Sequence, residues 1–438
     1  MSSNVLDTLD GNRITKRIGF IAFVAAMGAF LDGYDNMVIG AALLIIQPAW
    51  KLNAAQVGLL GSIAFLGMAV GGFVFGRLTD KFGRKTSFVL DLLLFVIGGL
   101  VSAFATNITI FTVGRLIIGV AIGADVPIST SLIAEISPKN KRGFLTGLMQ
   151  PLWFFGAFCS TMIAVVFLSS GNNNAWRWAI GLGVVIAVIV MGLRTRIPES
   201  PRWLMAQGKK VNTEEIGIKS NETMQTSDTQ NSSLKVLFSK RYAVSLSVVL
   251  LFWFLALYRG GTFNSYVPLL LQMFGFKAKL AALEVNAVMY LVYSIVSLFT
   301  AIYLDRMGRR SVILIGWAFN VVLTFSLAFV SQSQPIVFVA LLMGSTIFNQ
   351  IVTTALYPWS VEFFPTMLRA TAQGMATGVS RLGALLASFA FPLMQVSFGW
   401  TGTVEVVSII MFAGLIAGII LRPADTSNRS LEDISMSN

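Results

Sequence analysis

The chain has 438 residues, of which 55% are hydrophobic and 12% charged, and its mean hydropathy is +0.76. Water-soluble globular domains carry about a quarter charged residues, so this composition excludes a soluble protein. Cys159 is the single cysteine and histidine is absent, which excludes an internal disulfide and argues against haem, zinc and histidine-based catalysis. We therefore expect no metal site and no cofactor.

Apolar runs recur along almost the whole chain, and each is long enough for a helix of about 20 residues to cross a hydrocarbon core about 30 Å thick. In chain order they cover 18–46, 54–76, 86–106, 110–135, 143–168, 176–193, 242–273, 279–303, 311–330, 335–358, 370–396 and 400–421. The pattern predicts an all-α membrane protein with twelve transmembrane helices.

The basic residues are sorted between the two sides of these spans. With twelve spans both termini share a side, and 25 of the 32 Lys and Arg residues lie in the tails and loops of that side. Such loops are cytoplasmic, so the net charge of +12 reflects topology in a lipid bilayer and does not predict a nucleic-acid partner. We expect a multi-pass protein of the cytoplasmic membrane with both termini cytoplasmic. The first 17 residues contain Asp7 and Asp10 and no hydrophobic core, unlike a cleaved signal peptide.

A long polar stretch divides the spans into six and six. It predicts an N-terminal six-helix bundle over 1–193, a cytoplasmic linker over 194–241, a C-terminal six-helix bundle over 242–422 and a cytoplasmic tail over 423–438.

The two halves repeat each other. The sequence DKFGRK at 80–85 recurs as DRMGRR at 305–310, an offset of 225. At an offset of 227, Glu135, Pro138, Arg142 and Gly147 recur as Glu362, Pro365, Arg369 and Gly374. Two independent motifs at nearly one offset indicate a duplicated six-helix unit, and parallel repeats around a central midplane site are a transporter architecture.

The sequence GRLTDKFGRK at 76–85 resembles the loop signature of the major facilitator superfamily, and PESPRWL at 198–204 resembles the segment after the sixth helix in its sugar-porter and metabolite-symporter branches. Gly114-Arg115 with Gly119 and Gly123, and the tail PADTSNRSLE at 423–432, match the same branches. The resemblance implies two six-helix bundles related by a pseudo-two-fold axis, which rock around a central site in alternating access. We expect the protein to function as a monomer.

The repeated Asp-x-x-Gly-Arg turns predict a gate. Each turn places an anion and clustered cations where helix ends expose partial charges, so it can hold neighbouring helix ends together in one conformation. We expect a cytoplasmic gate that holds the outward-facing state, made by Gly76, Asp80, Gly83, Arg84, Glu135, Arg142, Asp305, Gly308, Arg309, Glu362 and Arg369. The alternative is that these basic loops serve topology alone, which requires charge but no fixed spacing.

Ionisable residues inside the spans predict proton coupling, because charge at mid-bilayer is costly and is usually functional. Asp32 lies at the midpoint of the first span, with Asp35 one turn further out, and Arg115 is displaced in the same direction on the fourth span. In proton-coupled sugar porters, which Gly33-Tyr34-Asp35 and Gly114-Arg115 resemble, the corresponding Asp and Arg are associated. Asp35 with Arg115 is therefore the first candidate for coupling, with Asp32 or Asp125 in reserve. The alternative is a static ion pair that fixes helix packing.

The C-terminal half carries mid-span cations, Arg259 and Arg381, where the N-terminal half carries carboxylates. Because Arg binds carboxylates in a bidentate geometry, this favours a substrate with an acidic group. Further candidates for the pocket are Tyr258, Asn264, Tyr266, Gln150, Asn349, Gln373 and Trp359. For the aromatic residues the alternatives are space filling and the interfacial belt common in membrane proteins, and for Arg259 an ion pair with Asp32.

The paired glutamines of the sugar porters' seventh helix are replaced here by Leu255 and Ala256, whereas Leu31-Asp32-Gly33-Tyr34-Asp35 resembles aromatic-acid proton symporters. We expect proton-coupled uptake of a small organic anion, so the partners are a small-molecule substrate, a proton and the lipid bilayer. A sugar or polyol porter is the alternative, and drug efflux ranks third. A non-transporting sensor has little room for a cytoplasmic domain, and no motif indicates an enzyme.

Overall fold

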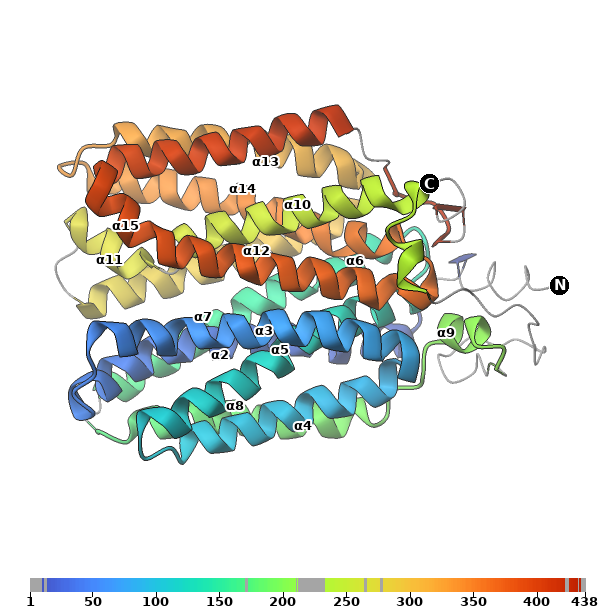
Figure 1. Ribbon diagram of the computed structural model, residues 1–438, viewed down its shortest axis with the longest axis horizontal. Helices are drawn as coiled ribbons and strands as arrows, with labels where there is room; N and C mark the ends of the chain where they lie inside the picture. Colours follow the sequence, from blue (N-terminus) through green and yellow to red (C-terminus); the bar gives the residue numbers. More distant parts are fainter. Residues whose placement is uncertain are drawn as a thin grey trace.

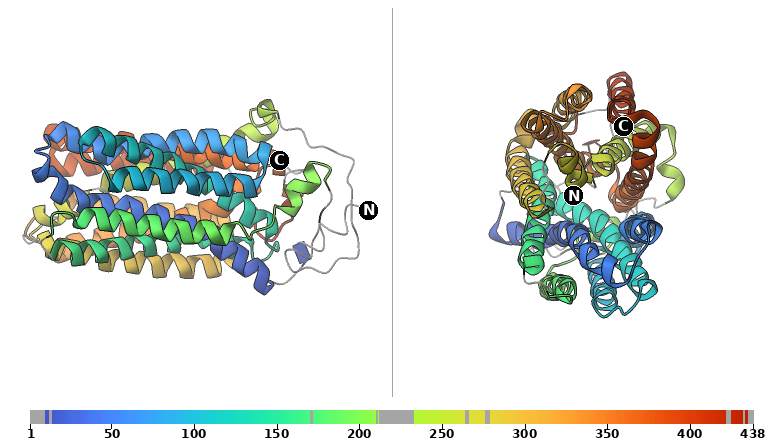
Figure 2. Two further views of the ribbon diagram at one scale, coloured as in Figure 1. Left: turned by 90° about the horizontal axis from the view of Figure 1, so that it is seen from below. Right: turned by 90° about the vertical axis from the view of Figure 1, so that its left-hand side faces the viewer.

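The computed structural model describes residues 10–11, 14–169, 172–209, 211, 233–263, 266–275, 279–421, 425–431 and 433–434. Within this part of the chain every regular element is a helix. Two groups of long helices lie side by side with their axes along the long direction of the molecule (Figure 1). The end-on view separates the two groups clearly (Figure 2).

The N-terminal bundle contains the first half of the chain. Its helices are α2 (Lys16–Ala49), α3 (Ala54–Phe82), α4 (Arg84–Ala103), α5 (Ile108–Ile136), α6 (Arg142–Gly147), α7 (Met149–Ser169) and α8 (Ala175–Arg194). The short helix α9 (Pro201–Ala206) follows the bundle. Asn53 and Asn107 begin α3 and α5 as N-caps, because their side chains accept from backbone amides of the first turn.

The C-terminal bundle contains the second half. After the 3₁₀ turn η2 (Leu234–Val236) come α10 (Lys240–Phe263), α11 (Val267–Met273), α12 (Lys279–Met307), α13 (Arg309–Ser326), η4 (Leu327–Phe329), α14 (Pro335–Glu362) and α15 (Thr366–Leu421). The helix α15 is 56 residues long and reverses direction at Gly399, whose φ of 66° is outside the helical range. It therefore supplies two antiparallel spans (Figure 1).

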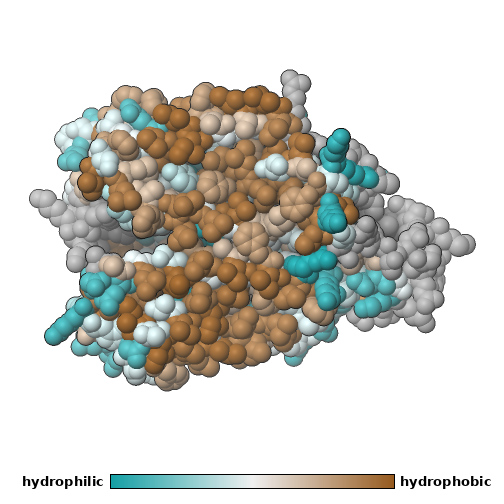
Figure 3. All heavy atoms as spheres, in the orientation of Figure 1, coloured by the Kyte–Doolittle hydropathy of each residue, from teal (hydrophilic) through white to brown (hydrophobic). Residues whose placement is uncertain are grey.

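The outer surface is suited to a bilayer. Among the described residues, eleven helices are long and apolar enough to span a membrane, and the doubled α15 brings the number of spans to twelve. Large hydrophobic side chains such as Phe389, Val396 and Ile420 are exposed on the outer faces. On the face seen in Figure 3, hydrophobic side chains form a brown belt between more polar ends. The prediction of an all-α membrane protein with twelve transmembrane helices is confirmed.

The fifth predicted span, 143–168, is covered by α6 and α7; Leu148 between them keeps helical backbone angles, and Arg142–Phe167 forms one apolar run. The seventh predicted span, 242–273, contains α10 and α11, and residues 264–265 between them lie outside the described part.

The two bundles make their closest approach at one end, which we call the basic end and define by the turns at Gly83 and Gly308. There α3 and α15 lie backbone to backbone: a Cβ on Gly374 would lie 2.2 Å from the Gly72 carbonyl oxygen and 2.9 Å from the Gly76 Cα. Only glycine fits such an approach. Arg142 at this end pairs with Asp10 at 3.1 Å and donates to the Arg429 carbonyl at 3.1 Å, so segments near both ends of the chain meet there.

Candidate functional site

A central cavity lies between the two bundles. It contains about 580 Å³ of space that no atom fills, including solvent at its mouth. From α5 and α7 of the N-terminal bundle it is lined by Val126, Gln150, Trp153 and Phe154. From α10, α14 and α15 it is lined by Trp253, Ala256, Leu257, Gly260, Asn349, Gln350, Thr353, Tyr357, Thr377, Ser380 and Arg381.

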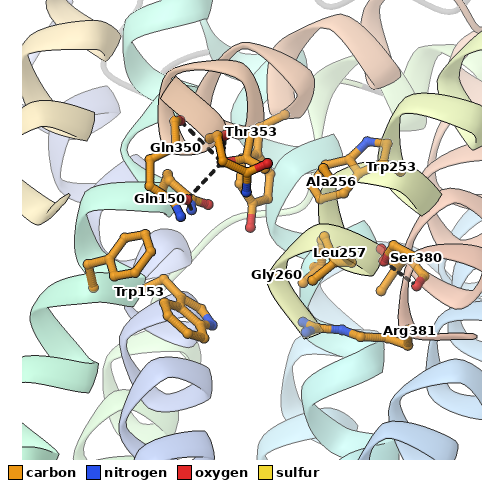
Figure 4. A pocket seen from close by; sticks show the side chains of 15 residues that line it. Gln150, Trp153, Trp253, Ala256, Leu257, Gly260, Gln350, Thr353, Ser380 and Arg381 are labelled. Atoms are coloured by element: carbon orange, nitrogen blue, oxygen red, sulfur yellow. Dashed lines mark hydrogen bonds between the residues drawn. The ribbon is translucent and has the colours of Figure 1, made fainter. Parts of the chain in front are cut away.

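Amide and hydroxyl groups form one side of the cavity. Gln150 Nε2 donates to Gln350 Oε1 at 2.6 Å across the bundle interface, and Thr353 donates to the same oxygen at 3.0 Å. Asn349 is held from behind, because its Oδ1 accepts from Asn320 at 3.0 Å. In the close-up, Gln150, Gln350 and Thr353 lie above Trp153 and Arg381 (Figure 4).

Aromatic side chains form the apolar part of the wall. Trp253 meets Tyr357 edge to face at 5.1 Å between ring centroids, and Trp153 meets Phe154 in the same way at 4.8 Å. The indole N–H of Trp253 is buried and has no acceptor among the described residues. A buried donor without a partner is costly, so this N–H is available to a ligand acceptor.

The charged group in the wall is Arg381. Its Nη2 lies 3.0 Å from Asp32 Oδ2, which joins α15 of one bundle to α2 of the other. Asn36 also donates to the Asp32 carboxylate. The cavity wall therefore contains a cation held by a carboxylate that belongs to the opposite half of the molecule.

Asp35 and Arg115 lie next to each other, as the sequence predicted. Arg115 Nη1 is 2.7 Å from both Asp35 oxygens, and both side chains are buried. Asp125, the reserve candidate, lies elsewhere in the same bundle, where its carboxylate is 2.6 Å from Arg194. Within the described residues no three His, Cys, Asp or Glu side chains gather in a way that would ligate a metal.

Arg259 is outside the cavity wall, contrary to the expected arrangement. It is fully buried between α10 and α14, where it donates to Ser345 Oγ at 2.5 Å and Thr346 Oγ1 at 3.0 Å and lies over the Phe263 ring. No described carboxylate is within ion-pair distance, so the suggested pair with Asp32 is also absent: Arg381 occupies that place. The sequence placed both arginines near mid-span but did not show which face of its helix each occupies.

Four other predicted pocket residues do not line the cavity. Tyr258 stacks on Phe254, and Tyr266 donates to the Ser388 carbonyl at 2.6 Å. Gln373 accepts from Ser360, and Trp359 packs on Phe252 and Phe363. Gln150, Asn349 and Arg381 do line it, while Asn264 lies outside the described residues.

At the basic end the first repeat motif forms a network between the bundles. Arg84 Nη2 lies 3.1 Å from Asp80 and 2.8 Å from Glu135, and it donates to the Thr366 carbonyl at 2.9 Å. Asp80 accepts from the backbone and hydroxyl of Thr371, both at 2.7 Å. Arg369 of the C-terminal half then pairs with Glu135 at 3.0 Å.

The second motif forms the corresponding network. Arg309 Nη2 lies 2.8 Å from Asp305 and 3.1 Å from Glu362. Asp305 accepts from the backbone amides of Gly143 and Phe144, both at 2.9 Å, at the start of α6. Arg142 approaches Glu362 at 4.0 Å. The expected gate residues are thus brought together at the basic end, where Gly76 supplies the close α3–α15 contact.

Residues 21–437 match the family model described as sugar (and other) transporter. The chain belongs to this family. As a member of the sugar (and other) transporter family it is a membrane transporter of the major facilitator superfamily, as the motifs predicted, and it is not an enzyme.

Relatives of this sugar (and other) transporter carry different substrates in their names. The chain is 28% identical to the arabinose-proton symporter of Bacillus subtilis, with 95% of each chain covered. It is 25% identical to the niacin transporter NiaP of Acinetobacter baylyi, over 95% of this chain and 96% of that one. A solved structure of the proton:xylose symporter XylE with 6-bromo-6-deoxy-D-glucose matches with a TM-score of 0.81 at 21% identity, over 97% of this chain and all of that one.

Sequence reasoning missed two residues of this transporter's basic end. Glu199 accepts from the backbone amides of Arg84 and Lys85, at 2.8 and 3.2 Å, and so caps α4 after the positive-φ turn at Gly83. Asp425 accepts from the backbone amide of Arg309 at 3.3 Å and caps α13 after Gly308. The offset of 226 between Glu199 and Asp425 was the signal that could have identified them.

Proposed function

We propose that the protein is a proton-coupled importer of a small organic acid in the cytoplasmic membrane, with both termini cytoplasmic. It functions as a monomer by alternating access around the central cavity. The basic end is the cytoplasmic end, and its two ionic networks are the gate. In the structure this gate is closed, because both networks bridge the bundles.

The observation that carries the choice of substrate is the Asp32–Arg381 pair in the cavity wall. A substrate carboxylate competes with Asp32 for the Arg381 guanidinium, since both are planar anions that the same donors bind. When Asp32 loses its cation in a site closed to water, its neutral, protonated form is favoured. Binding of the acid and uptake of a proton are thereby linked across the bundle interface.

The Asp35–Arg115 pair supplies the outer part of the same coupling device. Its carboxylate alternates between the guanidinium and a proton as the pair opens, without any histidine. Trp153, Trp253 and Tyr357 offer flat apolar surface to a ring, and the free Trp253 N–H offers a donor. The relative that carries niacin, a pyridine carboxylic acid, supports this substrate class.

A sugar or polyol is the second candidate. The cluster of Gln150, Asn349, Gln350 and Thr353 can exchange hydrogen bonds with several hydroxyl groups. The arabinose-proton symporter among the relatives supports it.

The deciding experiment is a thermal-shift screen of purified protein against small carboxylates, aromatic acids, hexoses, pentoses and polyols. A ligand that binds the folded state raises its melting temperature by mass action. Each hit is then tested for accumulation in proteoliposomes with and without an inward proton gradient. A carboxylate hit whose accumulation needs the gradient supports the acid importer, whereas a sugar as sole hit refutes it.

A further inference from the structure

Three buried charged side chains meet inside the N-terminal bundle, away from the central cavity. Arg194 is the last residue of α8, and its two terminal nitrogens lie 3.1 Å from Asp91 Oδ2 on α4 and 2.6 Å from Asp125 Oδ1 on α5. All three are at least nine-tenths buried, and the guanidinium lies 4.2 Å from the centre of the Phe88 ring. We call these three residues the Arg194 cluster.

The charges of the Arg194 cluster do not balance. It contains two carboxylates and one guanidinium, and both carboxyl groups bind the same Arg194 side chain. Two buried carboxylates that share one guanidinium repel each other, which favours a proton on one of them. A single shared proton makes the cluster neutral, which is the state that a membrane interior favours.

The surrounding ionisable groups do not supply the missing positive charge. Asp32 on α2 and Tyr357 on α14 interact electrostatically with Asp125, and neither carries a positive charge. The neighbouring arginines have partners of their own: Arg115 pairs with Asp35, Arg381 with Asp32, and Arg84 with Asp80 and Glu135. Arg177 donates to the Ala103 and Ala105 carbonyls at the opposite end of the bundle.

The Arg194 cluster connects to the cavity through Asp125. The Asp125 carboxyl group lies against the bare backbone of Gly28, where a Cβ would be 2.0 Å from its oxygen. Asp32 is one turn further along α2 on the same face, and it interacts electrostatically with Asp125. Val126, next to Asp125, lines the cavity. Asp32, Asp125 and Asp91 thus form a series of carboxyl groups from the cavity wall to the end of α8.

We propose that Asp125 and Asp91 are a proton exit route from Asp32 to the basic end, inside the N-terminal bundle and separate from the substrate's path between the bundles. The Asp125–Asp91 pair holds one proton. When Asp32 gives up its proton, the pair accepts it on Asp125 and releases the proton on Asp91 beside Arg194, so the charge of the cluster is restored. The next residue, Thr195, is exposed, which places the exit at the surface. This inference rests on the proton coupling proposed above.

The first test needs no substrate. Infrared spectroscopy of the purified full-length protein at neutral pH detects the C=O stretch of a neutral carboxylic acid. We expect Asp91→Asn and Asp125→Asn each to lose one such band, because the remaining carboxylate then pairs one to one with Arg194 and ionises. Glu405→Gln, at a half-buried carboxylate of α15 in the other bundle, is the matched control and keeps the band. A band unchanged in both Asp variants overturns the shared proton.

The second test separates this inference from the proposed function. Proteoliposomes are loaded with a pH-sensitive dye and given nicotinate or arabinose, whichever the wild-type protein accumulates. We expect both Asn variants to retain exchange of labelled substrate, which also shows that they are folded, and to lose accumulation and proton entry. Wild-type-like accumulation in both refutes the exit route. If the wild-type protein accumulates arabinose and none of the acids of the screen, the acid importer is refuted instead, and the infrared result still decides the shared proton.

Discussion

Gly374→Ala is expected to open the basic end of the transporter. In the structure the added Cβ would lie 2.2 Å from the Gly72 carbonyl oxygen, whereas real Cβ contacts are essentially never below 3.0 Å. The α3 and α15 backbones must therefore separate by at least about 0.8 Å, since no flexible side chain can give way. Overpacking of this kind costs about 1–3 kcal/mol. In the proposed alternating access the two helices separate when the basic end opens, so we expect the cost to fall on the closed state alone.

A cost of about 1–3 kcal/mol shifts the equilibrium between the two states by about 5–150-fold toward the open basic end. The assay is the distance between spin labels at two exposed positions, Lys139 in the N-terminal half and Arg306 in the C-terminal half, both changed to Cys in a Cys159→Ser background. We expect the longer-distance population to grow. Gly123→Ala is the matched control, because its Cβ would lie 2.0 Å from the Met68 oxygen within a single bundle. If Gly374→Ala lowers the melting temperature as Gly123→Ala does but leaves the label distances unchanged, the reasoning is refuted.

Three further predictions concern the cavity, the coupling pair and the caps. Arg381→Lys should raise the Km for a carboxylate at least about tenfold, because bidentate geometry is lost, whereas Arg259→Lys should leave Km unchanged; equal effects in uptake kinetics would contradict the placement of the two arginines. Asp35→Asn should abolish accumulation driven by the proton gradient and spare exchange, and normal accumulation would exclude a coupling role. Glu199→Ala should destabilise the N-terminal bundle by about 0.5–2 kcal/mol, as loss of a helix cap does, and an unchanged melting temperature would show that the cap contributes nothing.

The fold could be predicted from the sequence because the bilayer requires apolar spans and sorts basic residues to one side. The internal repeat indicates two similar bundles. The partner of Asp35 could also be predicted, because Asp35 and Arg115 belong to motifs that resemble those of proton-coupled sugar porters. The pairing across the bundles at the basic end, Glu135 with Arg369 and Glu362 with Arg142, could not be predicted, because the repeat places each carboxylate near an arginine of its own half. The cavity was harder. Whether Arg259 or Arg381 faces it depends on the rotation of a helix that is apolar on every side, and periodicity carries no signal there.

Trp153 and Gln350 also line the cavity, but only the nearby Gln150 and Asn349 were predicted to do so. Asp91 and its partner Arg194 lie on different helices, and no local sequence pattern connects the two.

The caps at Glu199 and Asp425 bear on how the two halves arose and how they can be separated. Each residue follows the sixth span of its own half and returns to cap a helix of that same half. The unit that was duplicated therefore included its trailing segment, and a half that stops with its last span is incomplete. Separately expressed halves should be divided after α9, so that Glu199 stays with the N-terminal piece, and the C-terminal piece should retain Asp425.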